Sequence, residues 1–306
     1  MGKKKIGIKW KASMMPSQEG KRVVVTGSNS GIGFEMAMAL AGHGAHVIMA
    51  CRNSEKADVA KVRILEAHPQ AQVTVEIVDL AELKSIHAFT ERLRIADQPL
   101  DILINNAGVM IPPASTTADG FELQIGTNHI GHFALTAGLL PLLERAAAGR
   151  IVTVSSIAHW AGRIDFEDLN GRQKKYNKWG MYSQSKLANL LFALELDRRL
   201  KAAGSSVESF ASHPGYSNTQ LQRHSLLWRI LNVGFAVAPS KGAAPTLYAA
   251  TEADARSHRY WGLVGPMEAW GWTGRANITP HAADETTAKR LWALTEELSG
   301  VPFLSG

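Results

Sequence analysis

The stretch that most restricts the fold of this chain is a short apolar strand followed at once by a glycine-rich turn and a helix. Residues 22–26 (Arg-Val-Val-Val-Thr) have the composition of a buried strand, and an amphipathic helix is expected over residues 31–44. Between them, Gly27 permits a tight turn, Gly31 lets backbone N–H groups approach a phosphate, and Gly33 lets the helix pack close to the sheet. This unit predicts a parallel α/β sheet that binds a dinucleotide.

The rest of the chain alternates predicted strands with predicted helices, as a doubly wound sheet requires. Further strands are expected at residues 45–51, 72–78, 100–104, 150–156, 206–211 and 260–264, the last being the final strand. Helices are expected at residues 53–65, 81–96, 122–147, 181–200, 240–251 and 283–299. We therefore predict a single Rossmann-type α/β domain over residues 21–306, with about seven parallel strands and helices on both faces.

Residues just after two predicted strands are placed to contact the adenosine part of a dinucleotide. Arg52 follows the strand at residues 45–51, where an acid would bond the ribose 2′-hydroxyl and an arginine suits a 2′-phosphate. Arg52 therefore favours NADP(H) over NAD(H), unless it is only a solvated charge that opens the next helix. Asp79 and Leu80 end the strand at residues 72–78, and Asp79 either accepts from the adenine amino group or caps the following helix.

Tyr182 and Lys186 are four residues apart in a predicted helix, so they lie one turn apart on the same face. A free phenol has a pKa near 10 and exchanges protons poorly at neutral pH. We expect the Lys186 ammonium to lower the pKa of the Tyr182 phenol and make it a usable acid and base. Alone, such a pair is more often a chance feature of a solvated helix face.

Polar side chains follow two strands of the predicted sheet centre. Asn105-Asn106-Ala107-Gly108 comes after the strand at residues 100–104, where small residues would let a cofactor lie close to the backbone and the asparagines would also bond neighbouring strands. Ser156 ends the strand at residues 150–156, at the edge of the sheet where ligands bind in this fold. Ser156 is placed to hydrogen-bond a substrate oxygen, or else it is an ordinary turn or cap serine.

Asn128 lies inside the predicted helix at residues 122–147, where an asparagine costs about 0.5 kcal/mol relative to alanine and needs a partner. It either holds a water or kinks the helix. His129 and His132 flank it, but no third ligand stands at useful spacing, so we expect packing or polar roles and no metal site.

Charge and cysteine content exclude several classes of protein. The net charge is +6, but the first 11 residues hold five lysines and no acid, so the remainder carries only +1 and does not suggest nucleic-acid binding. Residues 1–20 are therefore expected to be a flexible, solubilising leader. Cys51 is the only cysteine, which excludes internal disulfides and fits a cytoplasmic location. No apolar run reaches about 18 residues, so we expect no membrane span.

In order and spacing, these motifs resemble the short-chain dehydrogenase/reductase family over residues 21–302. The shared segments are TGSNSGIG (26–33), NNAG (105–108), Asn128, Ser156, YSQSK (182–186) and HPGYSNT (213–219). The segments ACRN (50–53), VSSIAH (154–159) and SKLAN (185–189) are similar to the branch that contains retinol dehydrogenases and protochlorophyllide reductases. Members of that branch mostly use NADP(H), in agreement with Arg52.

The resemblance implies roles for individual residues. Tyr182 would exchange the proton on the substrate oxygen, Lys186 would lower the Tyr182 pKa and bond the nicotinamide ribose, and Ser156 would position the carbonyl or alcohol. Asn128 would hold a relay water. The cofactor-binding residues would be Gly27, Ser28, Ser30, Gly31, Ile32, Gly33, Arg52, Asp79, Leu80, Asn106, Ala107, Gly108, Tyr182, Lys186, Pro214, Gly215, Ser217 and Thr219.

The chain departs from the family's compact members between Ser156 and Tyr182. The intervening residues 160–178 form an insertion rich in aromatic side chains, expected at the mouth of the site. Residues 219–239 are expected to be a substrate lid, with Leu226, Leu227, Trp228, Ile230, Leu231 and Phe235 either walling a lipophilic pocket or packing as core. The cluster of Trp261, Trp270 and Trp272 has no role that the sequence assigns.

We therefore expect an NADP(H)-dependent oxidoreductase that moves a hydride between nicotinamide and a carbonyl or alcohol carbon of a lipophilic small molecule. The first alternative is reduction of a C=C bond. The second, of another class, is an NADP-binding regulator without turnover, against which the complete Tyr182, Lys186, Ser156 and Asn128 set argues. The resemblance also allows a homodimer or homotetramer.

Overall fold

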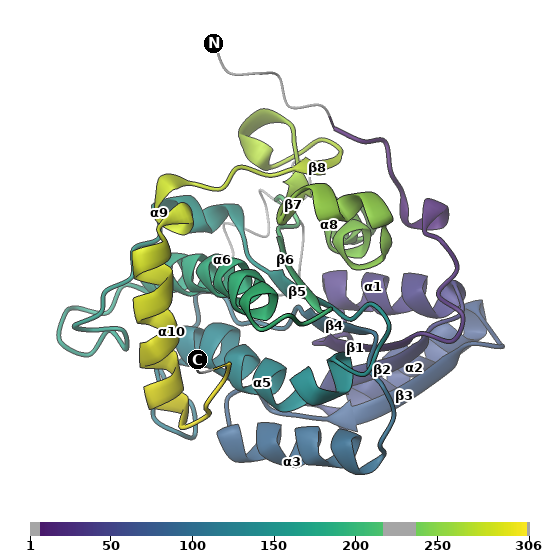
Figure 1. Ribbon diagram of the computed structural model, residues 1–306, viewed down its shortest axis with the longest axis horizontal. Coiled ribbons are helices and arrows are strands. Elements are labelled where there is room, and N and C mark those ends of the chain that lie inside the picture. Colours follow the sequence, from purple (N-terminus) through teal and green to yellow (C-terminus); the bar gives the residue numbers. More distant parts are fainter. Residues whose placement is uncertain (1–6, 217–236, 305–306) are drawn as a thin grey trace.

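The computed structural model describes residues 7–216 and 237–304, which form one sheet covered by helices on both faces (Figure 1). The strands are β1 (Arg22–Thr26), β2 (His46–Cys51), β3 (Gln72–Ile77), β4 (Ile102–Asn105), β5 (Arg150–Val154), β6 (Glu208–Ser212), β7 (Tyr260–Leu263) and β8 (Thr273–Arg275). Their order is β3-β2-β1-β4-β5-β6-β7-β8, and all neighbours are parallel except β7 and β8. The Rossmann-type prediction is confirmed, but β7 is not the last strand, because the short antiparallel β8 makes an eighth.

The helices connect the strands in the predicted order. The longer ones are α1 (Gly31–Gly42), α2 (Ser54–Ala67), α3 (Leu83–Ile95), α5 (Gly131–Leu143), α6 (Lys178–Ala202), α8 (Pro239–Thr251) and α10 (Glu285–Ser299). The short turns are η1 (Ala12–Met14), α4 (Leu123–Ile125), η2 (Gly126–Ile130), η3 (Ile157–Ala161), η5 (Ala253–Ser257), η6 (Pro266–Glu268) and α9 (Pro280–Ala283).

Strand β1 shows why the sheet has a core on each side. Side chains alternate between the faces of a strand, so Val23 and Val25 join the cluster that contains α1 and α8, while Val24 joins the cluster that contains α5. All three valines are fully buried. A strand buried on both faces is necessarily apolar throughout, which is why the sequence predicts this strand so clearly.

The helix predicted at residues 122–147 is broken into three pieces. One turn of α4 leads into the π-helical turn η2, and α5 continues from Gly131. Asn128 lies in the π-helical turn. Turns of this kind are rare in proteins as a whole. Those that do occur often lie at functional sites.

Residues 7–20 contradict the expectation of a flexible leader. Trp10 is only 5% exposed, its ring makes an edge-on contact with Tyr248, and its Nε1 donates to Glu252 Oε1 at 2.9 Å. Ile8 forms a β-bridge with Thr273 of β8. This part of the leader is therefore a strap on the domain, because its apolar side chains find a place in the core.

The C-terminal helix α10 lies beside α6 and α5 (Figure 1). Phe133 of α5, Phe192 of α6, Trp292 of α10 and Phe303 form one aromatic cluster there, with ring centroids 5.0–6.4 Å apart. Side chains from three helices thus close this side of the domain.

The three tryptophans do not form the single cluster considered from the sequence. Trp261 is 1% exposed and packs on Tyr248, whereas Trp270 and Trp272 are each 37% exposed. Two sets of predicted residues lie outside the described ranges: the apolar lid residues (Leu226, Leu227, Trp228, Ile230, Leu231 and Phe235) and the cofactor contacts Ser217 and Thr219. The two residues that flank 217–236 are bonded to each other, because the Val237 N–H donates to the Tyr216 carbonyl at 2.8 Å.

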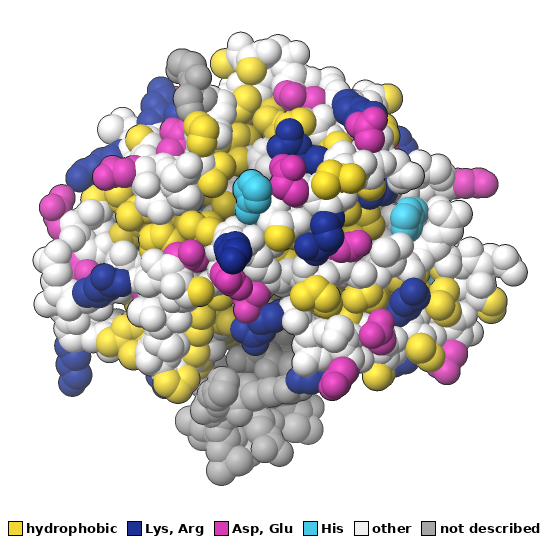
Figure 2. Space-filling view, turned by 90° about the horizontal axis from the view of Figure 1, so that it is seen from below, with side chains coloured by type: hydrophobic (Ala, Val, Ile, Leu, Met, Phe, Trp, Pro, Cys, Tyr) yellow, Lys and Arg dark blue, Asp and Glu magenta, His cyan; other side chains and the backbone are white. Residues whose placement is uncertain are grey.

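Figure 2 shows basic and acidic side chains interleaved on the face seen from below, without gathering by sign. Within residues 7–216 and 237–304, no helix combines the length and the apolar character needed to cross a bilayer.

Candidate active site

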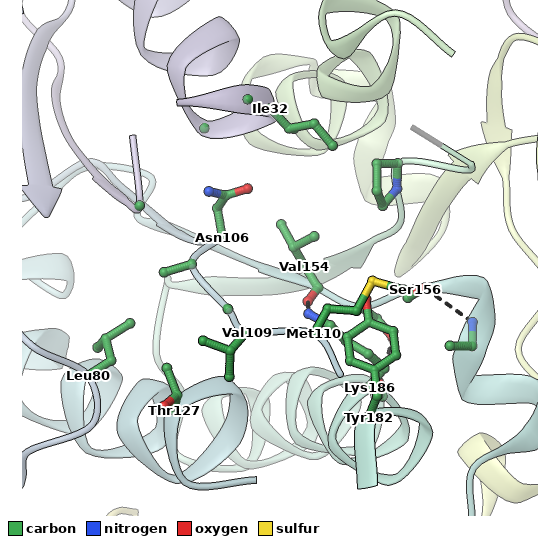
Figure 3. Close-up of a pocket in the computed structure, with 18 of the residues that line it drawn as sticks. Ile32, Leu80, Asn106, Val109, Met110, Thr127, Val154, Ser156, Tyr182 and Lys186 are labelled. Carbon is green, nitrogen blue, oxygen red and sulfur yellow. Dashed lines mark hydrogen bonds between the residues drawn. The ribbon is translucent and has the colours of Figure 1, made fainter. Parts of the chain in front are cut away.

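A cavity of about 640 Å³ opens at the carboxyl ends of the central strands, and residues from the glycine turn to α6 line it (Figure 3). Ile32 lies on one side of it, Tyr182 and Lys186 lie on the other, and Asn106 and Val154 lie between them (Figure 3). This is the edge where doubly wound sheets bind ligands, and the volume suits a cofactor with a small substrate.

The glycine turn has the shape that a dinucleotide needs. Gly27 and Gly31 have φ of +66° and +58°, a region that other residues adopt only under strain. A Cβ on Gly33 would lie 2.4 Å from the Gly27 carbonyl oxygen and 2.5 Å from Asn106 Nδ2, so only glycine fits. Helix α1 begins at the cavity without a side-chain cap, which leaves its first N–H groups to a ligand. These features fit a bound dinucleotide phosphate.

The cofactor-binding residues predicted in the glycine turn and at Arg52, Asp79 and Leu80 line the cavity, with one exception. Arg52, Asp79 and Leu80 are at its wall, and Arg52 Nη1 lies 4.0 Å from Asp79 Oδ2. Ser28 does not line the cavity, because its buried hydroxyl donates to the Val25 carbonyl at 2.9 Å and closes the turn. The neighbouring Asn29 lines the cavity instead and was missed.

Asp79 does not cap the helix that follows it. Its Oδ1 accepts from the Ala81 N–H at 2.9 Å, in a turn that precedes α3, while the Leu83 N–H donates to Asp119 Oδ2. The helix-cap alternative for Asp79 is therefore wrong, and its carboxylate remains beside Arg52 at the cavity wall.

The other predicted cofactor-binding residues within the described ranges also line the cavity. Ile32, Ala107, Gly108, Pro214 and Gly215 all line the cavity, and Ser30 lines it beside Gly31. Asn106 Nδ2 donates to the Thr26 carbonyl at 2.8 Å and ties β4 to the glycine turn, while Asn105 is fully buried and bonds Thr136. The asparagines therefore have the structural role that the sequence suggested, and Asn106 also faces the cavity.

Tyr182, Lys186 and Ser156 meet at the cavity. Tyr182 and Lys186 are on one face of α6, and both are at most 8% exposed. The Ser156 hydroxyl caps the turn η3 by accepting from the Ala158 N–H at 3.2 Å, and it also bonds the Tyr182 phenol. The cap role of Ser156 is thus confirmed, and the same cap fixes a hydroxyl at the cavity wall, where its contact with a substrate oxygen stays a prediction.

The pKa shifts of the pair run against the expectation. Burial raises the pKa of Tyr182 to about 12, and the bond from Ser156 only partly opposes this. Burial lowers the pKa of Lys186 to about 8. The Lys186 ammonium lies 5.8 Å from the centroid of the Tyr182 ring and donates to the Val154 carbonyl at 3.2 Å. Desolvation therefore sets the direction of the Tyr182 shift, and the predicted lowering of the phenol pKa is wrong.

Asn128 clamps the backbone beside the cavity. Its Oδ1 accepts from the Val109 N–H at 2.8 Å, and its Nδ2 donates to the Val109 carbonyl at 3.0 Å and to Ser185 Oγ at 2.9 Å. Asn128 itself does not line the cavity, whereas Thr127 does. The three bonds join the Gly108–Val109 wall to α6, so the side chain positions the site.

His129 and His132 have polar partners, as the sequence suggested. His132 shares hydrogen bonds with Thr26 Oγ1 and the Asn128 carbonyl, and His129 with Thr295 Oγ1. Burial lowers the pKa of His132 to about 4 and that of His129 to about 3, so both are neutral at pH 7. No group of three metal-binding side chains occurs among the residues that the structure describes.

The insertion at residues 160–178 is tied to α4, which directly precedes the turn that carries Asn128. The Tyr176 hydroxyl donates to Glu122 Oε1 at 2.8 Å, and Glu122 Oε2 accepts from the Gln124 and Ile125 N–H groups. Gln124 in turn accepts from the Ile111 N–H and donates to the Lys178 carbonyl. These buried contacts join the start of α6 to the cavity wall. The sequence offered no signal for them, because Glu122 and Tyr176 are 54 residues apart.

Comparison with known proteins decides the family. A sequence profile described as short chain dehydrogenase matches residues 21–229. The chain belongs to the short-chain dehydrogenase family. Human (Homo sapiens) retinol dehydrogenase 13 is 41% identical over 299 residues, which cover 92% of this chain and 85% of that protein. Human retinol dehydrogenase 11 is 43% identical over 288 residues, which cover 93% and 87%.

Solved structures agree with this assignment. An uncharacterised protein from Mycobacterium Paratuberculosis is 44% identical, superposes with a TM-score of 0.82, and covers 97% of this chain and 99% of its own. The RhlG/NADP active-site complex of Pseudomonas aeruginosa is 23% identical with a TM-score of 0.63, covers 80% and 94%, and shows the shared fold. This short-chain dehydrogenase is thus an NAD(P)-dependent oxidoreductase of the class that acts on alcohols.

Proposed function

We propose that the chain catalyses NADP(H)-dependent interconversion of a carbonyl and an alcohol on a lipophilic small molecule, with Tyr182 as acid and base. The observation that carries this proposal is the convergence of Tyr182, Ser156 and Lys186 on one cavity that the glycine turn and Arg52 also line. The nicotinamide, when bound, supplies or accepts the hydride.

The protein's own residues manage the proton and the substrate oxygen. With a pKa of about 12, the Tyr182 phenol is protonated at neutral pH and is ready to donate to a carbonyl oxygen. The Ser156 hydroxyl, fixed by its cap on η3, holds that oxygen beside the phenol. The Lys186 ammonium favours the phenolate that remains after proton transfer, because an opposite charge nearby stabilises it.

The preference for NADP(H) over NAD(H) rests on Arg52. The Arg52 side chain is 70% exposed at the cavity wall, and its Nη1 lies 4.0 Å from Asp79 Oδ2. The guanidinium is therefore available to a 2′-phosphate. Arginine suits this role because its planar fork bonds phosphate oxygens in pairs.

A lipophilic substrate is favoured by the apolar wall of the cavity. Met110, Trp160, Trp179 and Met267 line the same cavity as Tyr182, together with small residues of η3 such as Ala158. Apolar and aromatic walls with few polar groups select apolar ligands.

The test is a substrate screen with the purified full-length chain and NADPH. Long-chain aldehydes, lipophilic ketones and an enone are supplied in turn, and the product is assigned by mass and NMR. An alcohol product supports the proposal. A saturated ketone from the enone, with the carbonyl intact, would favour reduction of a C=C bond instead.

Variants separate catalysis from cofactor binding. Tyr182→Phe should lower kcat/KM by about 10²–10⁴-fold with little change in NADPH affinity, because it removes only the proton donor. The control is Tyr248→Phe, which changes a buried tyrosine that packs on Trp10 and Trp261. An NADP-binding regulator without turnover would bind NADPH and reduce nothing in the screen, and activity retained in Tyr182→Phe would overturn the assignment of Tyr182.

Location and assembly complete the proposal. The free, buried thiol of Cys51 fits a reducing compartment such as the cytoplasm. A homodimer or homotetramer stays a prediction, and α10, which packs on α6, covers part of that helix. Light scattering of the purified chain measures this directly.

A further inference from the structure

The connection between β7 and β8 holds two consecutive residues in a strained backbone conformation. Met267 and Glu268 have φ of +52° and +55°, the left-handed region that non-glycine residues seldom occupy. Each such residue costs about 1–2 kcal/mol, and the cost persists only where the surroundings impose it. A turn of this kind therefore indicates a function for the side chains that it presents.

The two side chains point to different places. Met267 is 73% exposed and lines the cavity, as do Trp179 and Tyr216. Glu268 is 5% exposed, and its Oε1 accepts from the Asn277 N–H at 3.0 Å. The turn thus sends a long apolar side chain to the cavity wall and a carboxylate into the protein.

The buried carboxylate connects the turn to the cofactor wall. Glu268 Oε2 lies 3.3 Å from His213 Nε2, and His213 Nδ1 accepts from the Gly215 N–H at 3.2 Å. The Tyr216 N–H also donates to the Ala269 carbonyl at 2.9 Å. Pro214 and Gly215 line the cavity between these two anchors, so the turn and the cofactor wall are held as one unit.

Space for this unit is built into β7. A Cβ on Gly262 would lie 1.8 Å from His213 Nε2, so the imidazole occupies the room that a glycine leaves. His213 is fully buried as a result.

We propose that Met267 determines substrate specificity by forming an adjustable apolar wall, and that Glu268 is the positioning residue that holds it there through His213. The proposal rests on the proposed function. It adds that this wall contacts the apolar chain of the lipophilic substrate, beyond the carbonyl carbon. A methionine suits that task, because its flexible thioether adapts to apolar surfaces of varied shape. An apolar substrate chain would cover a side chain that is otherwise exposed to water.

The experiment measures chain-length preference in the full-length protein with NADPH. Straight-chain aldehydes from butanal to dodecanal are compared in wild type, Met267→Gly and Met267→Leu. Met267→Gly should lower kcat/KM for dodecanal about tenfold and leave butanal unchanged, because the lost contact serves only long chains. Its thermal midpoint should not fall, because glycine accepts the left-handed conformation freely. Met267→Leu should keep the preference, as should the control Met14→Ala, which changes an exposed methionine outside the cavity.

Glu268 is tested through the same readout. Glu268→Gln keeps the shape but offers one oxygen to two donors, the Asn277 N–H and the His213 Nε2–H, so the preference for dodecanal should weaken less than in Glu268→Ala. Glu268→Ala removes the link to His213 and should raise KM for dodecanal as Met267→Gly does, although Met267 is intact. A purely structural role for Glu268 would instead lower the thermal midpoint and affect every aldehyde equally, which would overturn the positioning role.

A binding measurement keeps this test separate from the proposed function. Dissociation constants of the same aldehydes are measured with NADP⁺, which cannot reduce them, in a Tyr182→Phe background, with and without Met267→Gly. Weaker binding of dodecanal only when Met267 is removed supports the specificity role, even if Tyr182→Phe retains turnover and the assignment of Tyr182 fails. An unchanged chain-length profile in Met267→Gly, in both kcat/KM and binding, would refute the proposal.

Discussion

Replacing Lys186 by methionine should stabilise the cofactor-free protein while it abolishes turnover. The Lys186 ammonium is 5% exposed, and burial lowers its pKa from 10.5 to about 8. That difference corresponds to about 3 kcal/mol of unfavourable free energy for the buried charge at neutral pH. Methionine has a similar length and carries no charge, so it avoids this cost.

Two favourable contacts of Lys186 reduce the gain. The bond to the Val154 carbonyl contributes about 1 kcal/mol, and the position of the ammonium over the Tyr182 ring, at 5.8 Å, contributes about 0.5–1 kcal/mol. The Val154 carbonyl does not lose its last partner, because Asn189 Nδ2 also donates to it at 3.1 Å. We therefore expect a net stabilisation of about 1–2 kcal/mol, or about 2–4 °C in the thermal midpoint.

The pH dependence tests the cause. Between the folded-state pKa of about 8 and the ordinary value of 10.5, the unfolded wild-type chain holds the proton and the folded chain has lost it. Wild-type stability therefore rises with pH through this window relative to Lys186→Met, and the advantage of the variant shrinks. Below about pH 8 the advantage should be constant.

The assay is urea unfolding without cofactor at about pH 7 and about pH 10, with NADPH-dependent turnover measured in parallel. Lys178→Met changes an exposed lysine at the start of the same helix and serves as the control. If Lys186→Met is less stable than wild type near pH 7, or if its advantage does not depend on pH, the buried-charge reasoning is refuted.

Three further variants probe other parts of the site. Arg52→Asp should reduce the preference for NADPH over NADH in kcat/KM by about tenfold or more, because it removes a charge-assisted phosphate contact worth about 1.5–3 kcal/mol; an unchanged ratio contradicts the role of Arg52. Gly33→Ala should weaken NADPH binding and lower the thermal midpoint, because its Cβ would lie 2.4 Å from the Gly27 carbonyl oxygen; titration by fluorescence and thermal unfolding together check this. Tyr176→Phe should destabilise the protein by about 1.5–3 kcal/mol in urea unfolding, because the Tyr176 hydroxyl bonds the buried Glu122 carboxylate. An unchanged free energy of unfolding would mean that the insertion does not stabilise α4.

The parts of the fold that were predicted correctly have local physical causes. Strand β1 is apolar at every central position because it is buried on both faces, and its predicted bounds match the structure. Gly27, Gly31 and Gly33 sit where only glycine avoids strain or collision, so their spacing is visible in the sequence. Tyr182 and Lys186 share a helix face for the simple reason that they are four residues apart.

The parts that were missed depend on contacts between distant segments. The three residues of β8 have no apolar alternation, and they form a strand because their backbone pairs with β7. The left-handed turn at Met267 and Glu268 lacks the glycine or asparagine that would mark it, and it is held by His213. The direction of the Tyr182 pKa shift depends on how deeply α6 is buried, which no five-residue motif records.

The depth of burial also links the chemistry of the site to its substrate. Burial of Tyr182 raises the pKa of the phenol and keeps it protonated, which is the state that carbonyl reduction requires at neutral pH. Apolar residues such as Trp160 and Met110 line the same cavity, and they are the basis on which we propose lipophilic ligands. A more polar wall would bring the phenol pKa back toward its ordinary value and weaken the selection for apolar substrates at the same time. The proton-donor state of Tyr182 and the substrate class that we propose therefore have one physical cause.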